Sequence, residues 1–533
     1  MDQKQKREVL QDRAEQMRLS DMRKTKIICT LGPATDREGV LEAMVQEGLN
    51  VARMNFSHGT YEEHAKRIEA VKTLAKKNHQ PVAVMLDTKG PEIRTGELKE
   101  DSIFLKSGQE FTLFYEPRKG DLEGVSISFT ELYRDVAPGA EILLDDGLIS
   151  LVVKEIVGKD IVCEVKNDGR LSEHKGINVP NIHLNMPYMS EKDKNDILFG
   201  IKEDVDFIAA SFVRTQEDVM ELRHFLDDNG GKNIHIMAKI ENIEGVKNID
   251  AIIQASEAIM IARGDMGVEL PPEEVPVIQK MIIRKVYEAG KQVVTATQML
   301  DSMIKNPRPT RAEVTDVANA VYDGTSAIML SGETAAGKYP LEAFRMMVRI
   351  AQRTESDINY RHRFEVNIPR ASNDITAAIS HATCTTSYDL NAKAIVAVTK
   401  SGRSARMLSK YRPECMIISG TTDEKVYRQM GMSWGVIPIL VEEKKDIFEL
   451  FTHAIDVAKQ KKLVEKMNLY KDFYENFQPG DSGFAGLPQL ILVCEDEKHM
   501  AECFKEIVTN KVEIPQIKLL FTTDLRQNKD TLD

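Results

Sequence analysis

The sequence predicts an α/β protein with a (β/α)8 barrel, also called a TIM barrel, which carries an inserted all-β lid domain and is followed by a C-terminal α/β domain. Three observations lead to this fold class. Short apolar segments alternate eight times with helix-length segments, a run of short β-like pieces interrupts that alternation after its third repeat, and a separate α/β pattern follows it. An open doubly wound sheet is the alternative for the alternating part, because the two folds differ in strand order.

The length of 533 residues is too great for one hydrophobic core, so we expect about three domains. The expected barrel comprises residues 23–90 and 188–355, the lid 91–187 and the C-terminal domain 356–533, and residues 1–22 are expected to form a polar helical segment.

The composition, with 42% hydrophobic and 29% charged residues, is typical of globular proteins. A formal net charge of -12 argues against general binding of nucleic acid or of membrane surfaces. The six cysteines have neither pairing nor metal-ligand spacing, which predicts reduced thiols. Because there is no apolar run long enough for a bilayer and no secretory signal pattern, we expect a cytoplasmic protein.

Each expected strand is a short apolar run that stops at a polar or glycine-containing segment. Barrel strands are expected at 26–31, 50–55, 82–86, 206–211, 234–241, 258–262, 292–297 and 327–331, with helices at 40–47 and 61–77. Ser190 and Asp193 have the pattern of a helix N-cap. Lid strands are expected at 110–114, 141–144, 148–153 and 161–165. After a linker at 361–364, the C-terminal domain is expected to have a helix at 374–389, a second helix ending near 411, and strands at 394–398, 416–419, 436–440 and 490–493.

The strongest chemical signal lies at the ends of two consecutive strands. Lys239 and Glu241 are two residues apart, so they share one face of a strand, and Asp265 follows the next strand. Adjacent strands are about 4.8 Å apart, so Glu241 and Asp265 can reach one cation beside the Lys239 ammonium group. The alternative, a buried ion pair, is weaker because such a pair seldom adds net stability.

Polar residues also follow most of the other strands, where a barrel enzyme has its catalytic groups. They are Asn55, Ser57, Asp87, Thr88, Ser211, Thr297 and Ser331. Each of them alone is equally well explained as a cap or turn residue. Arg53, Arg94 and Lys175 add positive charge suited to phosphate, although a solvated surface charge is the simpler explanation for any one of them.

The chain resembles the pyruvate kinase family in an ordered set of segments. They are Thr25–Pro33, Asn50–His58, Asp87–Gly96, Leu144–Ile149, Ala238–Asn242, Ala262–Asp265, Ala296–Leu300 and Met329–Thr334. The resemblance runs in family order over roughly residues 23 to 420, which is far more specific than a single motif.

The resemblance implies phosphoryl transfer from phosphoenolpyruvate to ADP, giving pyruvate and ATP, as the last step of glycolysis. Glu241 and Asp265 would ligate Mg²⁺ or Mn²⁺, and Lys239 would stabilise the phosphoryl group and the enolate oxygen. The substrate contacts would come from Arg53, Lys239, Gly264, Asp265 and Thr297, and Thr297 with Ser331 would help a water to protonate the enolate.

The resemblance also implies a monovalent site and a nucleotide site. K⁺ would be bound by Asn55, Ser57, Asp87 and Thr88, and the nucleotide would be contacted by Asn55, His58, Arg94 and Lys175. Glu92 stands where K⁺-dependent members carry Glu. The lid would close over the site and exclude water.

The sequence departs from the family pattern at two places. Gln80 replaces an Arg that many relatives carry before the Pro-Val-Ala-Val segment, and the last hundred or so residues fit poorly. The turn formed by Thr399, Lys400, Ser401, Gly402, Arg403 and Ser404 resembles the effector phosphate loop of the family, with an ordinary strand-to-helix turn as the alternative. A sugar-phosphate effector and a homotetramer are family expectations.

Two other classes of function are alternatives. A metal-dependent barrel lyase that stabilises an enolate would share the Lys, Glu and Asp residues, but it would need neither the lid nor the K⁺ ligands. A catalytically silent regulatory protein would not need Lys239, Glu241, Asp265 and Thr297 together.

Overall fold

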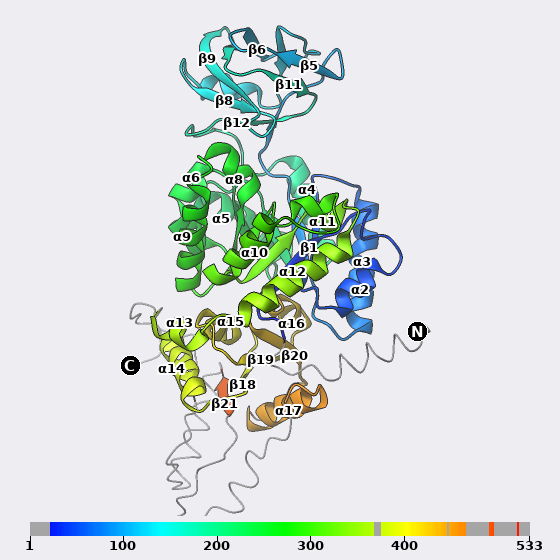
Figure 1. Cartoon of the computed structure of the whole chain (residues 1–533), viewed down its shortest axis with the longest axis vertical. Helices are drawn as coiled ribbons and strands as arrows, with labels where there is room; N and C mark the ends of the chain where they lie inside the picture. Colours follow the sequence, from blue (N-terminus) through cyan, green and yellow to red (C-terminus); the bar gives the residue numbers. More distant parts are fainter. Residues whose placement is uncertain (1–21, 367–374, 445–446, 465–489, 495–519, 522–533) are drawn as a thin grey trace, which may run out of the picture.

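The computed structural model describes residues 22–366, 375–444, 447–464, 490–494 and 520–521. In Figure 1 the barrel lies in the middle of the molecule, with the β-rich insertion at one end and the C-terminal domain at the other. The expected N-terminal helical segment, except for Met22, lies outside the described residues. Within the described residues, none of the helices has both the length and the apolar character needed to cross a bilayer.

The central sheet is a closed barrel of eight parallel strands, in the order β1-β17-β16-β15-β14-β13-β3-β2. Its strands are β1 (Lys26–Thr30), β2 (Val51–Asn55), β3 (Ala83–Asp87), β13 (Phe207–Ala210), β14 (His235–Ile240), β15 (Ala258–Ala262), β16 (Gln292–Ala296) and β17 (Ala327–Leu330). Because β1 pairs with both β2 and β17, the sheet has no edge, and this closure excludes the open doubly wound alternative.

The helices of the barrel form an outer ring around these strands (Figure 1). They are α2 (Val40–Gln46), α3 (Tyr61–Lys77), α4 (Glu191–Lys202), α5 (Gln216–Asp228), α6 (Ile243–Lys247), α7 (Ile249–Ala255), α8 (Arg263–Glu269), α9 (Val275–Glu288), α10 (Arg311–Asp323), α11 (Gly332–Ala335) and α12 (Pro340–Glu355). Capping boxes start several of them, including the predicted Ser190–Asp193 pair at α4.

The side chains of β14 divide between two cores, and this division orients the site. Ile236, Ala238 and Ile240 belong to the core between strands and helices, whereas Met237 belongs to the core inside the barrel. Because alternate residues of a strand point to opposite faces, Lys239 shares the inner face with Met237. The prediction that Lys239 points inward is thereby supported.

The insertion between β3 and α4 is built almost entirely of strands. They are β4 (Ile93–Arg94), β5 (Ser102–Leu105), β6 (Glu110–Phe114), β7 (Gly124–Ser126), β8 (Glu141–Leu144), β9 (Ile149–Val157), β10 (Asp160–Val165), β11 (Gly169–Ser172) and β12 (Gly176–Asn178). Seven of them form a mixed sheet in the order β4-β12-β8-β9-β10-β6-β7, and β11 pairs with β5. The short strands β4, β5, β7, β11 and β12 were not among those expected from the sequence.

The C-terminal domain has a five-stranded sheet in the order β20-β19-β18-β21-β22, in which all neighbouring strands are parallel. The strands are β18 (Ala394–Val398), β19 (Met416–Thr421), β20 (Val436–Leu440), β21 (Leu490–Cys494) and β22 (Leu520–Phe521). The helices are α13 (Tyr360–Val366), α14 (Ile375–Asp389), α15 (Arg403–Lys410), α16 (Glu424–Met430) and α17 (Ile447–Gln460). The prediction of a linker at 361–364 is wrong, because those residues lie within α13.

The C-terminal domain packs against the amino-terminal ends of the barrel strands through buried polar contacts. On α16, Arg428 pairs with Asp206, which precedes β13, with Nε 2.9 Å from Oδ1. The neighbouring Gln429 donates to the Asp206 carbonyl oxygen at 3.1 Å. From β1, the Lys26 ammonium group donates to the carbonyl oxygen of Val436 at 2.7 Å. These contacts fix the orientation of the domain on the barrel.

Candidate active site

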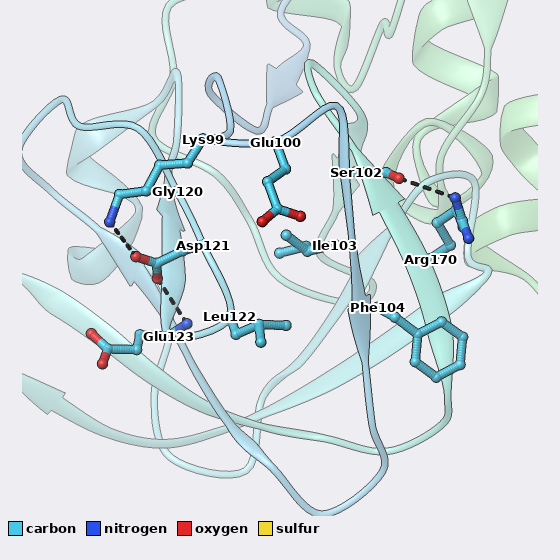
Figure 2. Close-up of a pocket in the computed structure, with 10 residues that line it drawn as sticks. All are labelled: Lys99, Glu100, Ser102, Ile103, Phe104, Gly120, Asp121, Leu122, Glu123 and Arg170. Carbon is cyan, nitrogen blue, oxygen red and sulfur yellow. Dashed lines mark hydrogen bonds and ion pairs between the residues drawn. The ribbon is translucent and has the colours of Figure 1, made fainter.

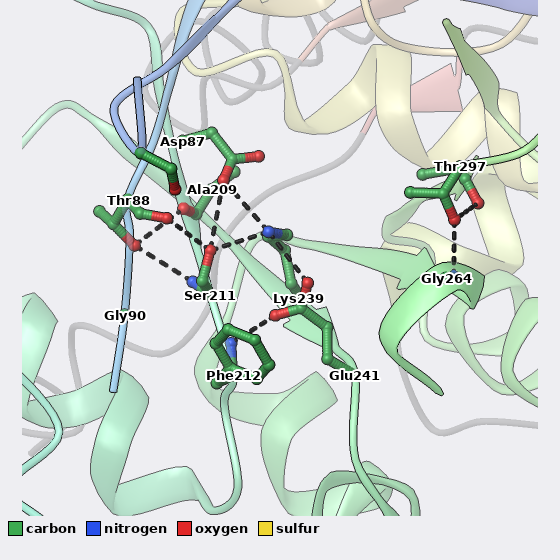
Figure 3. Close-up of polar contacts among 12 residues, drawn as sticks. Asp87, Thr88, Gly90, Ala209, Ser211, Phe212, Lys239, Glu241, Gly264 and Thr297 are labelled. Atoms are coloured by element: carbon green, nitrogen blue, oxygen red, sulfur yellow. Dashed lines mark hydrogen bonds and ion pairs between the residues drawn. The ribbon is translucent and has the colours of Figure 1, made fainter. Parts of the chain in front are cut away.

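Lys239 lies at the centre of a buried polar cluster at the carboxyl ends of β3, β13 and β14 (Figure 3). Its ammonium nitrogen is 3.1 Å from Asp87 Oδ1, 3.0 Å from Glu241 Oε1 and 2.8 Å from Ser211 Oγ. An ammonium group has three N–H donors, so these three acceptors use all of them. Burial lowers the pKa of Lys239, but Asp87 and Glu241 outweigh that effect and hold it above its usual value.

Glu241 and Asp265 form the carboxylate pair that the sequence predicts. Burial and the nearby Asp265 raise the pKa of Glu241 to about 7, against the opposing effect of Lys239. Burial also raises the pKa of Asp265, and the carboxylates of Asp146 and Glu92 in the insertion add to this shift. Within the described part of the chain, Asp265 forms no ion pair. Within the described residues, Lys239 is therefore the cation that pairs with this carboxylate pair, through Glu241.

The placement of Asp265 differs from the prediction in one respect. β15 ends at Ala262, and Asp265 lies in the first turn of α8 instead of at the end of the strand. The chain turns into a helix immediately after β15, so Asp265 still lies at the carboxyl rim of the barrel. Among the described residues, no three or more His, Cys, Asp or Glu side chains form a metal-binding group. The predicted divalent site has only two protein carboxylates.

Arg53 and Asp87 extend the cluster from Lys239 towards β1. Arg53 donates from Nε to Asp87 Oδ2 at 2.7 Å and from a terminal nitrogen to Thr30 Oγ1 at 2.8 Å. Burial opposes the ionisation of Asp87, yet Arg53 and Lys239 prevail and lower its pKa. Asp87 therefore links the two cations, with one carboxylate oxygen facing each of them.

Thr297 and Ser331, the predicted proton-transfer pair, follow β16 and β17. The hydroxyl of Thr297 donates to the Ala296 carbonyl oxygen at 2.7 Å and accepts from the Gly264 amide at 2.8 Å. Thr297 has a φ of 67°, a left-handed conformation that is rare for a β-branched residue. The buried Ser331 Oγ has no hydrogen-bond partner among the described residues.

Glu333 was missed by the sequence analysis although it lies in a quoted segment. Its carboxylate accepts from the Ser331 amide at 2.7 Å and from the Leu300 amide at 3.0 Å. It therefore ties the turn after β17 to the segment after β16. Ser211, which was noted only as a strand-end residue, was not assigned a role, and no sequence pattern distinguishes it from a cap.

The predicted K⁺ ligands lie on β2, β3 and the turns after them. Asn55 and Asp87 are register partners on these neighbouring strands. The Asn55 side-chain oxygen accepts from the Ser57 amide at 3.2 Å, and Thr88 Oγ1 accepts from the Ser211 amide at 3.2 Å. The structure therefore brings Asn55 and Asp87 side by side; Ser57 follows Asn55 by two residues, and Thr88 follows Asp87 directly.

Of the predicted nucleotide contacts, Arg94 and Lys175 lie close together in the insertion. The Thr95 amide, next to Arg94, donates to the Lys175 carbonyl oxygen at 2.8 Å. The Arg94 guanidinium pairs with Glu92 at 2.6 Å and the Lys175 ammonium group pairs with Asp145 at 2.9 Å. His58 follows β2 on the barrel, and among the described residues no hydrogen bond or ion pair joins it to Arg94 or Lys175.

A pocket of about 590 Å³ lies within the insertion, separate from the polar cluster (Figure 2). It is lined by Lys99, Glu100, Ser102, Ile103, Phe104, Gly120, Asp121, Leu122, Glu123 and Arg170. None of the residues predicted to bind substrate, nucleotide or metal is among them, so this pocket is distinct from the candidate active site.

The predicted effector loop joins β18 to α15. Gly402 has a φ of 75° and its amide donates to Thr399 Oγ1 at 2.9 Å, which closes a tight turn. Arg403 and Ser404 already belong to α15, so the loop is shorter than the predicted range. A strand-to-helix turn is compatible both with a phosphate loop and with the alternative of an ordinary turn, so the effector site stays a prediction.

Comparisons with known proteins cover most of the chain. Residues 22–344 match the family model of the pyruvate kinase barrel domain, and residues 377–470 match that of the pyruvate kinase alpha/beta domain. The pyruvate kinase of Clostridium acetobutylicum is 50% identical over 449 residues, which are 84% of this chain and 95% of that protein. The pyruvate kinase of Clostridium perfringens is 48% identical over 447 residues, covering 83% of this chain and 94% of that protein.

A solved structure of a pyruvate kinase from Cryptosporidium parvum is similar in fold and sequence. It has a TM-score of 0.80 and 41% identity, over 84% of this chain and 93% of that chain. The closed barrel, the inserted mixed sheet and the C-terminal α/β domain match the architecture of this family. Together with the two family models, these likenesses show that the chain belongs to the pyruvate kinase family.

Proposed function

We propose that this chain transfers the phosphoryl group of phosphoenolpyruvate to ADP, giving pyruvate and ATP, the last step of glycolysis. The observation that carries the proposal is the buried Lys239 ammonium group, which lies between Asp87 and Glu241 on the inner face of the barrel. A fixed cation at this place can stabilise negative charge that develops on a phosphoryl group or an enolate oxygen. The names of the relatives support the same reaction.

Glu241 and Asp265 fit a divalent cation, Mg²⁺ or Mn²⁺. They are oxygen donors, which hard cations prefer, and burial, with a smaller contribution from neighbouring carboxylates, raises the pKa of both. Mg²⁺ commonly uses one or two carboxylates and completes its shell with water and substrate oxygens. When bound, the ion would supply positive charge that neutralises oxygens of the phosphoryl group and the enolate.

Arg53, Lys239, Gly264, Asp265 and Thr297 are the proposed substrate contacts. Arg53 is oriented by its bonds to Asp87 and Thr30, and within the described residues its second terminal nitrogen is left to donate to a phosphate oxygen. Ser331 has a buried hydroxyl without a partner among the described residues, and this supports a role with Thr297 in orienting the water that protonates the enolate.

Asn55, Ser57, Asp87 and Thr88 are the proposed ligands of K⁺, because all four offer oxygen atoms around the ends of β2 and β3. A Lys at position 92 would place an ammonium group beside the Arg94 guanidinium, with which Glu92 now pairs at 2.6 Å. We therefore expect Glu92→Lys to reduce the need for K⁺, measured as the activity without K⁺ relative to that at saturating K⁺. An unchanged ratio would contradict this assignment.

Asn55, His58, Arg94 and Lys175 are the proposed nucleotide contacts. Arg94 and Lys175 lie close together in the insertion, paired with Glu92 and Asp145, and a nucleotide phosphate would compete with these carboxylates for the two cations. The insertion, residues 91–187, would act as a lid that excludes water and so prevents hydrolysis of the phosphate.

The remaining family expectations belong to the same proposal. They are a barrel domain at 23–90 and 188–355, a C-terminal domain at 356–533, a homotetramer, a cytoplasmic location, and control by a phosphorylated metabolite at the turn that starts at Thr399.

The direct test is a coupled assay for ATP formed from phosphoenolpyruvate and ADP in the presence of Mg²⁺ and K⁺. Sustained ATP formation that stops when a chelator removes the divalent ion supports the proposal. The absence of ATP from folded protein under these conditions would contradict it and would favour the enolate-stabilising lyase.

A further inference from the structure

The turn after β13 is the part of the polar cluster to which no role has yet been assigned. Ser211 is 1% exposed, and its hydroxyl oxygen is 2.8 Å from the Lys239 ammonium nitrogen, closer than either carboxylate (Figure 3). It is therefore the nearest of the three acceptors around the proposed catalytic cation. As a neutral group, it holds that cation by geometry and not by net charge.

The hydroxyl of Ser211 can face Lys239 only as an acceptor. Its oxygen is 2.6 Å from the Thr88 carbonyl oxygen and 3.2 Å from Asp87 Oδ1, and both of these groups can only accept. A serine hydroxyl has one proton and two lone pairs. The proton is directed to the β3 side, towards Thr88, and a lone pair is left for the ammonium group.

The backbone of Ser211 is also held on both sides. Its amide donates to Thr88 Oγ1 at 3.2 Å, and its carbonyl oxygen accepts from the Tyr188 hydroxyl at 3.2 Å. A Cβ atom added at Gly90, which has a φ of 72°, would be 2.8 Å from the Ser211 Cβ atom. The segment after β3 thus packs directly on Ser211 and leaves it little room to move.

Phe212, the next residue of the turn, holds Glu241, which pairs with Lys239. The Phe212 amide donates to Glu241 Oε2 at 2.6 Å, and Phe212 adopts a φ of 53°. A left-handed conformation is strained for a non-glycine residue, and such strain persists only where the surroundings impose it. The turn therefore holds Lys239 through a side chain and Glu241 through an amide.

We propose that Ser211 is a positioning residue for phosphoryl transfer, and that its hydroxyl fixes the ammonium group of Lys239 at the place where it meets the phosphoryl group. This inference rests on the proposed function. A lysine is a point charge on a flexible four-carbon stem, so it needs a third, neutral acceptor to hold it between two carboxylates that both attract it. Without that acceptor, the ammonium group moves towards Asp87 or Glu241 and away from the substrate.

The test compares Ser211→Ala with the wild-type chain at saturating Mg²⁺, K⁺ and ADP. We expect kcat to fall by roughly 10- to 100-fold, the loss that a misplacement of about 1 Å produces, while KM for phosphoenolpyruvate changes little. Ser356→Ala is the matched control, because within the described residues the Ser356 hydroxyl forms hydrogen bonds with Arg353 alone, at the end of α12, and its loss should leave kcat unchanged. If Ser211→Ala does not fold, Ser211→Cys keeps the size and replaces the hydroxyl by a weak acceptor, and the same loss is expected.

Two further measurements separate positioning from other roles. In a Lys239→Met background, Ser211→Ala should cause no additional loss, because it acts through the side chain that is already missing. Raising the K⁺ concentration should not restore kcat. A kcat close to wild type, a loss of equal size in both backgrounds, or recovery at high K⁺ would each overturn the inference. An inactive wild-type chain would instead overturn the proposed function.

Discussion

Both ends of the barrel bury charged side chains, but the two ends differ in whether each buried carboxylate has its own cationic partner. At the amino-terminal end, Asp206 is 0% exposed and accepts from the Arg428 guanidinium at 2.9 Å and from the Val84 amide at 2.8 Å. At the carboxyl-terminal end, Glu241 shares Lys239 with Asp87, and Asp265 has no ion-pair partner within the described residues.

This difference separates a structural use of buried charge from a functional one. A buried ion pair with complete hydrogen bonding fixes geometry, whereas removal of one partner is costly. Carboxylates that lack a cation of their own are poised to bind one that is supplied from outside. The same barrel therefore uses one end to hold the C-terminal domain and keeps unneutralised charge at the other.

The largest expected effect is at the carboxyl-terminal end. Lys239→Met should lower kcat by about 10³-fold or more, because a fixed charge in a buried site stabilises the transition state strongly. The variant should fold, since methionine fills a similar volume and two carboxylates remain able to bind a cation. Steady-state assays of ATP formation measure the effect. Lys285→Met, which removes a surface pair with Asp250, is the control, and equal rates in the two variants would contradict the role of Lys239.

At the amino-terminal end the expected effect is on stability. Arg428→Leu leaves Asp206 buried without its counter-charge, and this should lower the free energy of unfolding by about 3–5 kcal/mol. Denaturant unfolding measures the change. Arg284→Leu breaks an exposed pair with Glu288 and should cost well below 1 kcal/mol. If the two substitutions cost the same, the ion pair of Asp206 does not hold the domains together.

The pH dependence of stability should report on Asp206. Burial raises its pKa to about 6, against the lowering effect of Arg428, whereas an unfolded aspartate has a pKa of about 3.9. Between these values the folded state binds more protons than the unfolded state, so the contribution of this group is fully present below about pH 4 and is lost as pH rises through about 6. The loss should amount to about 3 kcal/mol at most.

Unfolding measured by denaturant at several pH values tests this expectation. Asp206→Asn should remove the contribution and change the slope of stability against pH between about 4 and 6. Asp250→Asn, at an exposed position, should keep the wild-type slope. Parallel curves for Asp206→Asn and the wild type would show that this carboxyl does not titrate in that window.

The smallest expected effect concerns the divalent ion. Mn²⁺ at a hundred times its Kd should stabilise the wild-type chain by about 2.7 kcal/mol, because it binds the folded state only. Glu241→Gln should abolish most of this gain, and Asp206→Asn should preserve it. Thermal unfolding with and without Mn²⁺ measures both. An equal gain in all three proteins would place the metal elsewhere.

The sequence predicted the barrel and the inward direction of Lys239 because both follow from local periodicity. Side chains along β14 point alternately inward and outward, which places Met237 and Lys239 on the inner face. The barrel strands are apolar runs of about five residues that can be recognised in the sequence. The five short strands of the insertion, such as Ile93–Arg94, carry no such periodicity and were missed. Helix α13 was mistaken for a linker because its charged residues show no apolar stripe.

The contacts of the site that could not be predicted from the sequence were missed for a different reason. Ser211 acts on Lys239 from 28 positions away, and Glu333 joins two turns that are 31 or more positions apart in the chain. Nothing local distinguishes a serine that accepts from a distant ammonium group from one that caps a turn. The contacts become visible only when closure of the barrel brings the strand ends together.

The insertion leaves the barrel after β3 and returns before α4 and β13, and β3 and β13 are themselves paired, with Met85 opposite Phe207. Both connections of the insertion therefore start from neighbouring positions at the carboxyl-terminal rim of the barrel. A cap attached in this way can swing about a single axis without straining the ring beneath it. In evolution such a cap can also be exchanged, or replaced by a single loop, and the barrel would remain closed.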